Sequence, residues 1–99
     1  HLDWSRTAIE LERRLRAFTP WPGAFCTFDG ALLKVGEVKA LAGSGKPGEV
    51  LTAGPEGIDV ACREGVLRLV QVQPEGKRMM SAKDFLAARK VEKGSSPFG

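Results

Sequence analysis

Arg16-Ala-Phe-Thr-Pro-Trp-Pro-Gly-Ala-Phe25 is a stiff corner that joins a charged helical segment to the first strand of a β-rich region. Pro20 cannot continue a helix, and it favours extended angles in the residue before it. Pro22 restricts Trp21 in the same way, and Gly23 can adopt angles that other residues avoid. The backbone of the corner therefore has little conformational entropy to lose on folding.

A helix is predicted before this corner, over residues 7–18. Thr7 and Glu10 have the spacing of a capping box at the start of a helix. The apolar residues recur every three or four positions, which places them on one face of the helix: Ala8, Leu11, Leu15 and Phe18. Three arginines lie off this face, and residues 1–6 are interpreted as the end of a linker.

Short strands are predicted after the corner, between residues 24 and 73. Asp29-Gly30 is a strong two-residue hairpin signal. In the second strand the alternation of apolar and polar residues slips near Gly36, which indicates a β-bulge or a sharp bend. The last strand has Val or Leu on both faces, so it is expected at the centre of the sheet. The predicted strands cover residues 24–28, 31–41, 49–53, 58–62 and 66–73.

A basic loop, residues 73–78, leads to a second helix predicted over residues 81–90. Ser81 stands at its N-cap, and Met80 and Phe85 occupy the positions of a hydrophobic staple. Residues 94–99 are expected to form a frayed tail. The whole pattern predicts one domain over residues 1–99: mainly β, a small open barrel or curled sheet, with an N-terminal helix and a C-terminal helix.

Basic residues are concentrated at the two ends of the chain. In all, 15 Lys and Arg stand against 12 Asp and Glu in 99 residues. Residues 1–19 hold four Arg against three acids, residues 20–62 three Lys against five acids, and residues 63–99 eight cations against four acids. If both ends fold to the same side, they would form one basic face of the kind that binds nucleic acid. Solvated surface charge is the alternative, and no apolar run approaches the roughly 20 residues of a membrane span.

Catalytic and metal chemistry find little support in the sequence. Cys26 and Cys62 fall in apolar strand patterns, which favours reduced, buried thiols in a cytosolic protein, with a disulfide as the alternative. Two cysteines are too few ligands for a metal site. His1 is the only histidine, so a Ser-His-Asp or Cys-His site is not expected. The loop Gly43–Gly48 matches GxGxxG, but Pro47 and a strand follow where a phosphate-binding fingerprint needs a helix. The chain is therefore expected to bind or position a partner.

Lys77 and Arg78 are the best candidates for contact with that partner. They follow Gly76 in the basic loop, next to a helix start whose amides would also favour an anion. Phosphate contact is predicted, with solvated loop charge as the alternative. Further candidates for phosphate contact are Arg13, Arg14, Arg16, Lys34 and Lys83.

Two segments resemble the C-terminal domain of methionyl-tRNA formyltransferase. One is Arg16-Ala-Phe-Thr-Pro-Trp-Pro-Gly-Ala24, and the other is Gln73-Pro-Glu-Gly-Lys-Arg-Met-Met-Ser-Ala82 followed by Asp84-Phe-Leu86. Shorter segments are similar to the same family and fall in its order: Leu2-Asp3-Trp4-Ser5, Leu33-Lys34-Val35, Pro47-Gly48 and Gly57-Ile58. The resemblance covers about residues 2–90.

The resemblance implies an open Greek-key barrel related to the OB fold, and a cytoplasmic role in formylating initiator methionyl-tRNA. In that family an N-terminal catalytic domain of the same polypeptide binds formyl-tetrahydrofolate, so no cofactor, metal or catalytic residue is expected in this chain. The C-terminal domain presents a basic surface to the tRNA. An alternative is a structural packing domain of a sugar or folate formyltransferase with no tRNA role. A stand-alone binder of single strands is a third idea, for which Phe25 and Phe28 supply few aromatic rings.

Trp21 is predicted to be a structural staple, mostly buried between the first helix and the strands. Trp21→Ala should then lower the free energy of unfolding by about 3–5 kcal/mol, the range for large-to-small changes in a core, as measured by chemical denaturation. A small loss of stability with a large loss of RNA binding would instead support an exposed ring that stacks on a nucleobase.

Overall fold

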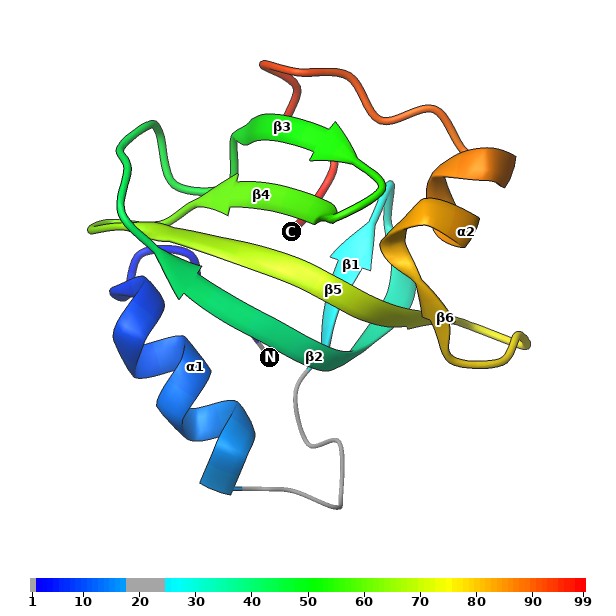
Figure 1. Cartoon of the computed structure of the whole chain (residues 1–99), viewed down its shortest axis with the longest axis horizontal. Coiled ribbons are helices and arrows are strands. Elements are labelled where there is room, and N and C mark those ends of the chain that lie inside the picture. Colours follow the sequence, from blue (N-terminus) through cyan, green and yellow to red (C-terminus); the bar gives the residue numbers. More distant parts are fainter. Residues whose placement is uncertain (1, 18–24) are drawn as a thin grey trace.

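The computed structural model describes residues 2–17 and 25–99, without the side chains of residues 16 and 17. In this part of the chain, six strands form one antiparallel sheet. The strand order is β1-β2-β5-β4-β3, and the short β6 pairs with β5. Figure 1 shows the curled sheet with one helix at each end of the chain. The elements are α1 (Ala8–Ala17), β1 (Phe25–Phe28), β2 (Ala31–Leu41), β3 (Val50–Gly54), β4 (Gly57–Ala61), β5 (Val66–Pro74), β6 (Met80–Ser81) and α2 (Ala82–Ala88).

The predicted mainly β fold with a helix at each end is confirmed, and the sheet is open rather than closed into a barrel. The five long strands lie within two residues of their predicted positions, whereas β6 was missed because two residues carry no alternation. The second helix is shorter than the predicted 81–90, because Arg89 has extended backbone angles. None of the helices in the described residues is long and apolar enough to cross a membrane.

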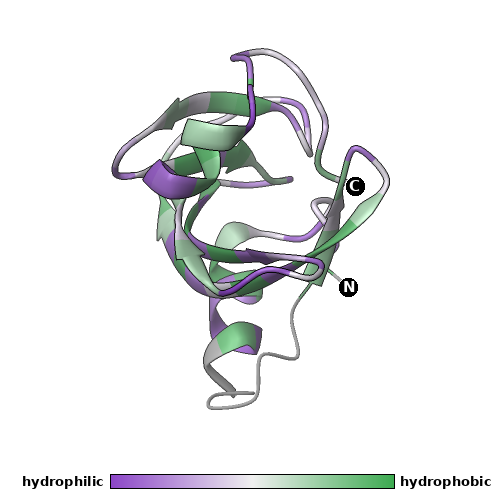
Figure 2. Cartoon of the chain, turned by 90° about the vertical axis from the view of Figure 1, so that its right-hand side faces the viewer, coloured by the Kyte–Doolittle hydropathy of each residue, from purple (hydrophilic) through white to green (hydrophobic). Residues whose placement is uncertain are grey.

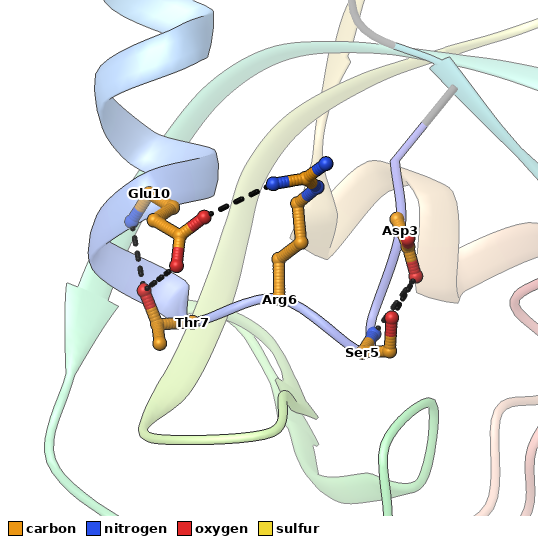
Figure 3. A network of polar contacts seen from close by, with 5 residues as sticks. All are labelled: Asp3, Ser5, Arg6, Thr7 and Glu10. Carbon is orange, nitrogen blue, oxygen red and sulfur yellow. Dashed lines mark hydrogen bonds and ion pairs between the residues drawn. The ribbon is translucent and has the colours of Figure 1, made fainter.

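The predicted capping box starts α1 (Figure 3). The Glu10 amide donates to the Thr7 hydroxyl oxygen at 3.2 Å, and that hydroxyl donates to the Glu10 carboxylate at 3.2 Å. Arg6 bonds to the same carboxylate at 3.3 Å. Hydrogen bonds from Arg6 and then from Thr7 hold the pKa of the Glu10 carboxyl below its ordinary value. The start of α1 is therefore fixed by side chains of its own first turn.

The predicted apolar face of α1 packs on the sheet. Ala8 and Leu11 are buried, and Leu15 packs against the core. Phe18 lies outside the described residues, as does the corner with Pro20, Trp21, Pro22 and Gly23. The carboxylate of Glu12 accepts a hydrogen bond from the Ala40 amide at 2.9 Å. Beyond its first four residues β2 has no β1 partner, so α1 supplies an acceptor along an edge that would otherwise be open.

Local sequence determines the shape of β2 at both of the predicted points. Asp29 and Gly30 both have positive φ, 49° and 85°, as the tight turn of the β1–β2 hairpin requires. The register of β2 against β5 shifts on both sides of Glu37, next to Gly36, which confirms the predicted bulge. The bulge bends β2, so that the sheet curls around its core.

β5 lies at the centre of the sheet, as predicted from its apolar faces, and the core lies inside the curl. Leu67, Leu69 and Val72 of β5 are fully buried. Figure 2 shows hydrophobic and hydrophilic residues alternating along strands of the sheet, as expected when one face is buried. The other large buried side chains are Leu11, Leu33, Val35, Val50, Ile58, Val60 and Phe85.

The C-terminal segment 94–99 is packed against the sheet, so the prediction of a frayed tail was wrong. Val50 of edge strand β3 exchanges backbone hydrogen bonds with Gly94 and Ser95, at 2.7 and 2.8 Å. Thr27 of edge strand β1 exchanges two with Gly99, at 3.2 and 2.9 Å. The segment thus spans the gap between the two edges of the open sheet. Its polar composition suggested disorder, but the unpaired backbone groups of two strand edges supply partners for it.

Phe98 anchors this segment: it is 3% exposed, and its ring lies 5.3 Å from that of Phe28. Phe98→Ala should lower the free energy of unfolding by about 3–5 kcal/mol, because it opens a cavity between the tail and the sheet. Chemical denaturation measures the loss, and Ser96→Ala, at an exposed position in the same segment, is the control. Equal stability of the two variants would show that the tail contributes nothing to the fold.

Cys26 and Cys62 are free thiols, both buried, as predicted. Burial raises the pKa of Cys26 to about 12 and that of Cys62 to about 11, so both are neutral at physiological pH. We expect an alkylating reagent at pH 8 to label neither thiol in the folded chain and both after denaturation, as counted by mass spectrometry. Rapid labelling of either thiol in the folded chain would contradict this burial.

Candidate nucleic-acid interface

The loop between β5 and β6 carries the two strongest candidates on a hydrogen-bonded frame. The Lys77 amide donates to the Pro74 carbonyl at 3.0 Å, and Gly76 between them has a φ of 78°. The Gln73 side chain donates to the Lys77 carbonyl at 2.8 Å. The backbone of the loop is therefore tied to the end of β5, while the side chains of Lys77 and Arg78 are exposed.

Lys34 and Lys83 lie at the same end of β5. Lys34 pairs with Gln73 in the register of β2 against β5, which places it beside the loop. Lys83 is in the first turn of α2, directly after β6. Both side chains are exposed, and within the described ranges none of the four cations, including Lys77 and Arg78, forms an ion pair. The structure thus brings together four of the seven predicted phosphate contacts.

The arginines of α1 are not part of this group. Arg13 borders a hollow with Leu41 and Gly65, whereas Arg14 borders another with the N-terminal segment. Figure 1 shows α1 and the β5–β6 loop on different sides of the molecule. The side chain of Arg16 lies outside the described residues. The α1 arginines and the cations of the β5–β6 loop therefore do not form one continuous face within the described residues.

Acidic residues limit the charge of the loop end. Glu75 lies in the loop, Glu37 follows on β2, and Asp84 is in the first turn of α2; all three are exposed. The start of α2 offers less to an anion than predicted. The helix has only seven residues, the Asp84 amide is already bonded to the Ser81 hydroxyl at 3.2 Å, and the Asp84 carboxylate stands in the same turn. Any attraction of phosphate therefore rests on the four cations.

A polar network on the outer face of the sheet was missed from the sequence. Arg68 of β5 holds Asp59 of β4 through two hydrogen bonds, of 2.8 and 3.1 Å, and Thr52 of β3 donates to the same carboxylate at 2.9 Å. Asp59 is 9% exposed, and the hydrogen bond to Asp59 raises the pKa of Arg68. Because both charges of the pair are satisfied, the network fixes the register of β4 against β5 and is not a binding group. The sequence alone does not show this pair, because Asp59 and Arg68 face each other only through the register of β4 against β5.

Comparison with known proteins identifies the family. The family model described as "Formyl transferase, C-terminal domain" matches residues 1–90. The methionyl-tRNA formyltransferase of Myxococcus xanthus is 62% identical over 97 residues, which are 98% of this chain and 31% of that protein. The methionyl-tRNA formyltransferase of Citrifermentans bemidjiense is 47% identical over 93 residues, 94% of this chain and 29% of that protein.

A solved structure has a similar fold. It is HypX from Aquifex aeolicus in complex with tetrahydrofolic acid, with a TM-score of 0.73 and 19% identity, over 96% of this chain and 20% of that one. At this identity the likeness concerns the fold alone. The chain spans about 30% of the length of the curated relatives it matches. It belongs to the family of formyl transferase C-terminal domains.

Proposed function

We propose that this domain binds tRNA for a methionyl-tRNA formyltransferase of the cytoplasm and holds initiator methionyl-tRNA for formylation. The observation that carries the proposal is the pair Lys77 and Arg78. Both side chains are exposed, without ion pairs among the described residues, on a loop whose backbone is hydrogen-bonded to β5. The names of the relatives with 62% and 47% identity support tRNA as the substrate class.

Catalysis is proposed to lie outside these 99 residues. The chain matches only about 30% of the length of its relatives, and both of its thiols are buried and neutral. We place the transfer of the formyl group, and the site of formyl-tetrahydrofolate, in an N-terminal catalytic domain of the same polypeptide. This domain would contribute binding energy and position to the reaction, and none of the reacting groups.

Recognition by this loop would be electrostatic. Lys77 and Arg78 would contact backbone phosphates and release their counterions, which gives affinity with little dependence on base sequence. Lys34 and Lys83 lie at the same end of the sheet and would extend the contact along the backbone. Arg13 and Arg14 would take part only if the tRNA wraps around the sheet towards α1.

A structural role is the second candidate, supported by a different surface. An apolar hollow of about 630 Å³ lies between the first turn of α1 and the end of β2, and Ile9 beside it is 56% exposed. A domain of a sugar or folate formyltransferase would use such a surface to brace its catalytic domain. The likeness in fold to HypX is compatible with this role. The two candidates differ in whether the loop cations matter.

The test is tRNA affinity across a salt series. The parent chain should bind tRNA with a Kd of roughly 10⁻⁴ to 10⁻⁶ M at physiological salt. Lys77→Ala with Arg78→Ala should weaken binding to every tRNA alike and reduce the salt slope by about one unit or more, since each phosphate contact contributes about 0.7–0.9. The free energy of unfolding should change by less than about 0.5 kcal/mol, because both residues are exposed.

The matched control removes two cations from the opposite end of β5. Lys46 lies in the loop before β3, and Arg63 lies in the turn between β4 and β5; both are exposed. Lys46→Ala with Arg63→Ala changes the net charge equally and should leave the salt slope close to that of the parent. If both double variants have the affinity and salt slope of the parent, the loop cations are solvated and do not contact tRNA, and the structural role is favoured.

A further inference from the structure

Two exposed hydrophobic side chains lie among the cations of the proposed RNA surface. Leu32 is 36% exposed and Met79 is 37% exposed, and the described residues have only one other large hydrophobic side chain as exposed, Ile9. Leu32 and Lys34 point outward from β2, since they alternate with the buried Leu33. The two apolar groups thus lie at the loop end of β5, beside the basic residues.

Met79 lies across the bulge of β2. A Cβ atom added at Gly36 would stand 2.7 Å from the Met79 methyl carbon and 2.9 Å from its sulfur. Since Gly36 has the outward parity of Leu32 and Lys34, the outer face of β2 presents an apolar group, a cation and a second apolar group in succession. The thioether rests on the backbone at Gly36, and Met79 as a whole is 37% exposed.

A shallow hollow of about 120 Å³ adjoins this row. Leu32 and Lys34 line one side, and Gln73 and Glu75 line the other. The Glu75 carboxylate would repel a phosphate placed in the hollow, but it accepts hydrogen bonds from groups such as the amino groups of bases. Phosphates would be attracted instead to Lys77 and Arg78, which directly follow Gly76 of the hollow in the chain. The charges and the apolar side chains therefore suit a partner that combines an anionic backbone with a flat group whose edge is polar and whose face is apolar.

We infer that Leu32 and Met79 contact an unpaired nucleobase of the bound RNA, while its phosphates lie on Lys77 and Arg78. A nucleotide combines a phosphate with a base whose face is apolar, and a duplex hides those faces in its stack. Only a single-stranded end or loop can offer both at once. In DNA complexes, leucine and methionine side chains insert between base steps and contact the base faces that the unstacking exposes. The inference rests on the proposed function, and it narrows the ligand to RNA with unpaired residues.

The experiment compares a two-stranded RNA duplex that has a short unpaired 3′ tail with the same duplex made blunt, which has no unpaired residue. The parent chain should bind the tailed RNA more tightly. Leu32→Ala and Met79→Ala should each weaken that binding about fivefold to tenfold, the lower end of the range for losing a base contact, and leave the blunt RNA unaffected. The salt slope should not change, because an apolar contact releases no counterion. Ile9→Ala is the matched control, and Met79→Leu should bind like the parent.

Equal affinity of the parent for tailed and blunt RNA would overturn the inference, as would unchanged binding by both alanine variants. If the Lys77 and Arg78 double variant still weakens binding in that case, only the base contact fails and the proposed function stands. If that double variant has no effect either, both fail. Slower formyl transfer by the full-length enzyme with unchanged RNA affinity would show that Leu32 and Met79 pack on protein, which also overturns the inference.

Discussion

β5 is hydrogen-bonded to three other strands, and this pairing determines where the core and the candidate site lie. One edge of β5 meets β2 along almost its whole length, while β4 and the short β6 also pair with it. Its buried side chains, Leu67, Leu69 and Val72, fill the centre of the core. The loop with Lys77 and Arg78 leaves directly from its end, and Gln73 of the same strand holds that loop. The position of the candidate site is therefore a consequence of strand pairing.

The parts of the fold that local chemistry controls were predictable from the sequence. The capping box of α1, the Asp29-Gly30 turn and the bulge near Gly36 each depend on residues that are neighbours in the chain. The C-terminal segment was not, because its stability comes from backbone groups of Thr27 and Val50, far away in sequence. A polar segment that pairs with strand edges has no periodic pattern of its own.

The sequence predicted only part of the candidate site, because local chemistry exposes some of its residues while long-range packing brings in the others. Lys77 and Arg78 could be chosen because a loop after a glycine exposes its side chains whatever the fold. That Lys34 lies beside this loop follows from the register of β2 against β5. Counting residues along the sequence does not predict this register, because β2 contains a bulge. The separation of Arg13 and Arg14 from the loop required the packing of α1 on β2. The sequence also did not predict Met79 as part of this surface, because only the structure shows that its side chain lies over the backbone at Gly36.

Different parts of this domain stabilise the fold and form the candidate binding surface. The curled sheet and its C-terminal segment supply stability, and the outer network of Asp59 and Arg68 is saturated by its own charges. One end of β5 is left with exposed cations and exposed apolar groups side by side. A surface of that kind suits a ligand that is charged and apolar at once, which neither a metal nor a small anion is.

Amide chemical shifts show whether RNA binds at the loop end of β5. The chain labelled with nitrogen-15 is titrated with initiator tRNA, and the amide signals are followed by NMR. We expect the largest changes at residues 73–79 and around Lys34, and small ones at residues 42–48 and 62–65 at the opposite end. If the largest changes occur at α1 or at that opposite end, or if no signal changes, RNA does not bind at the loop end of β5.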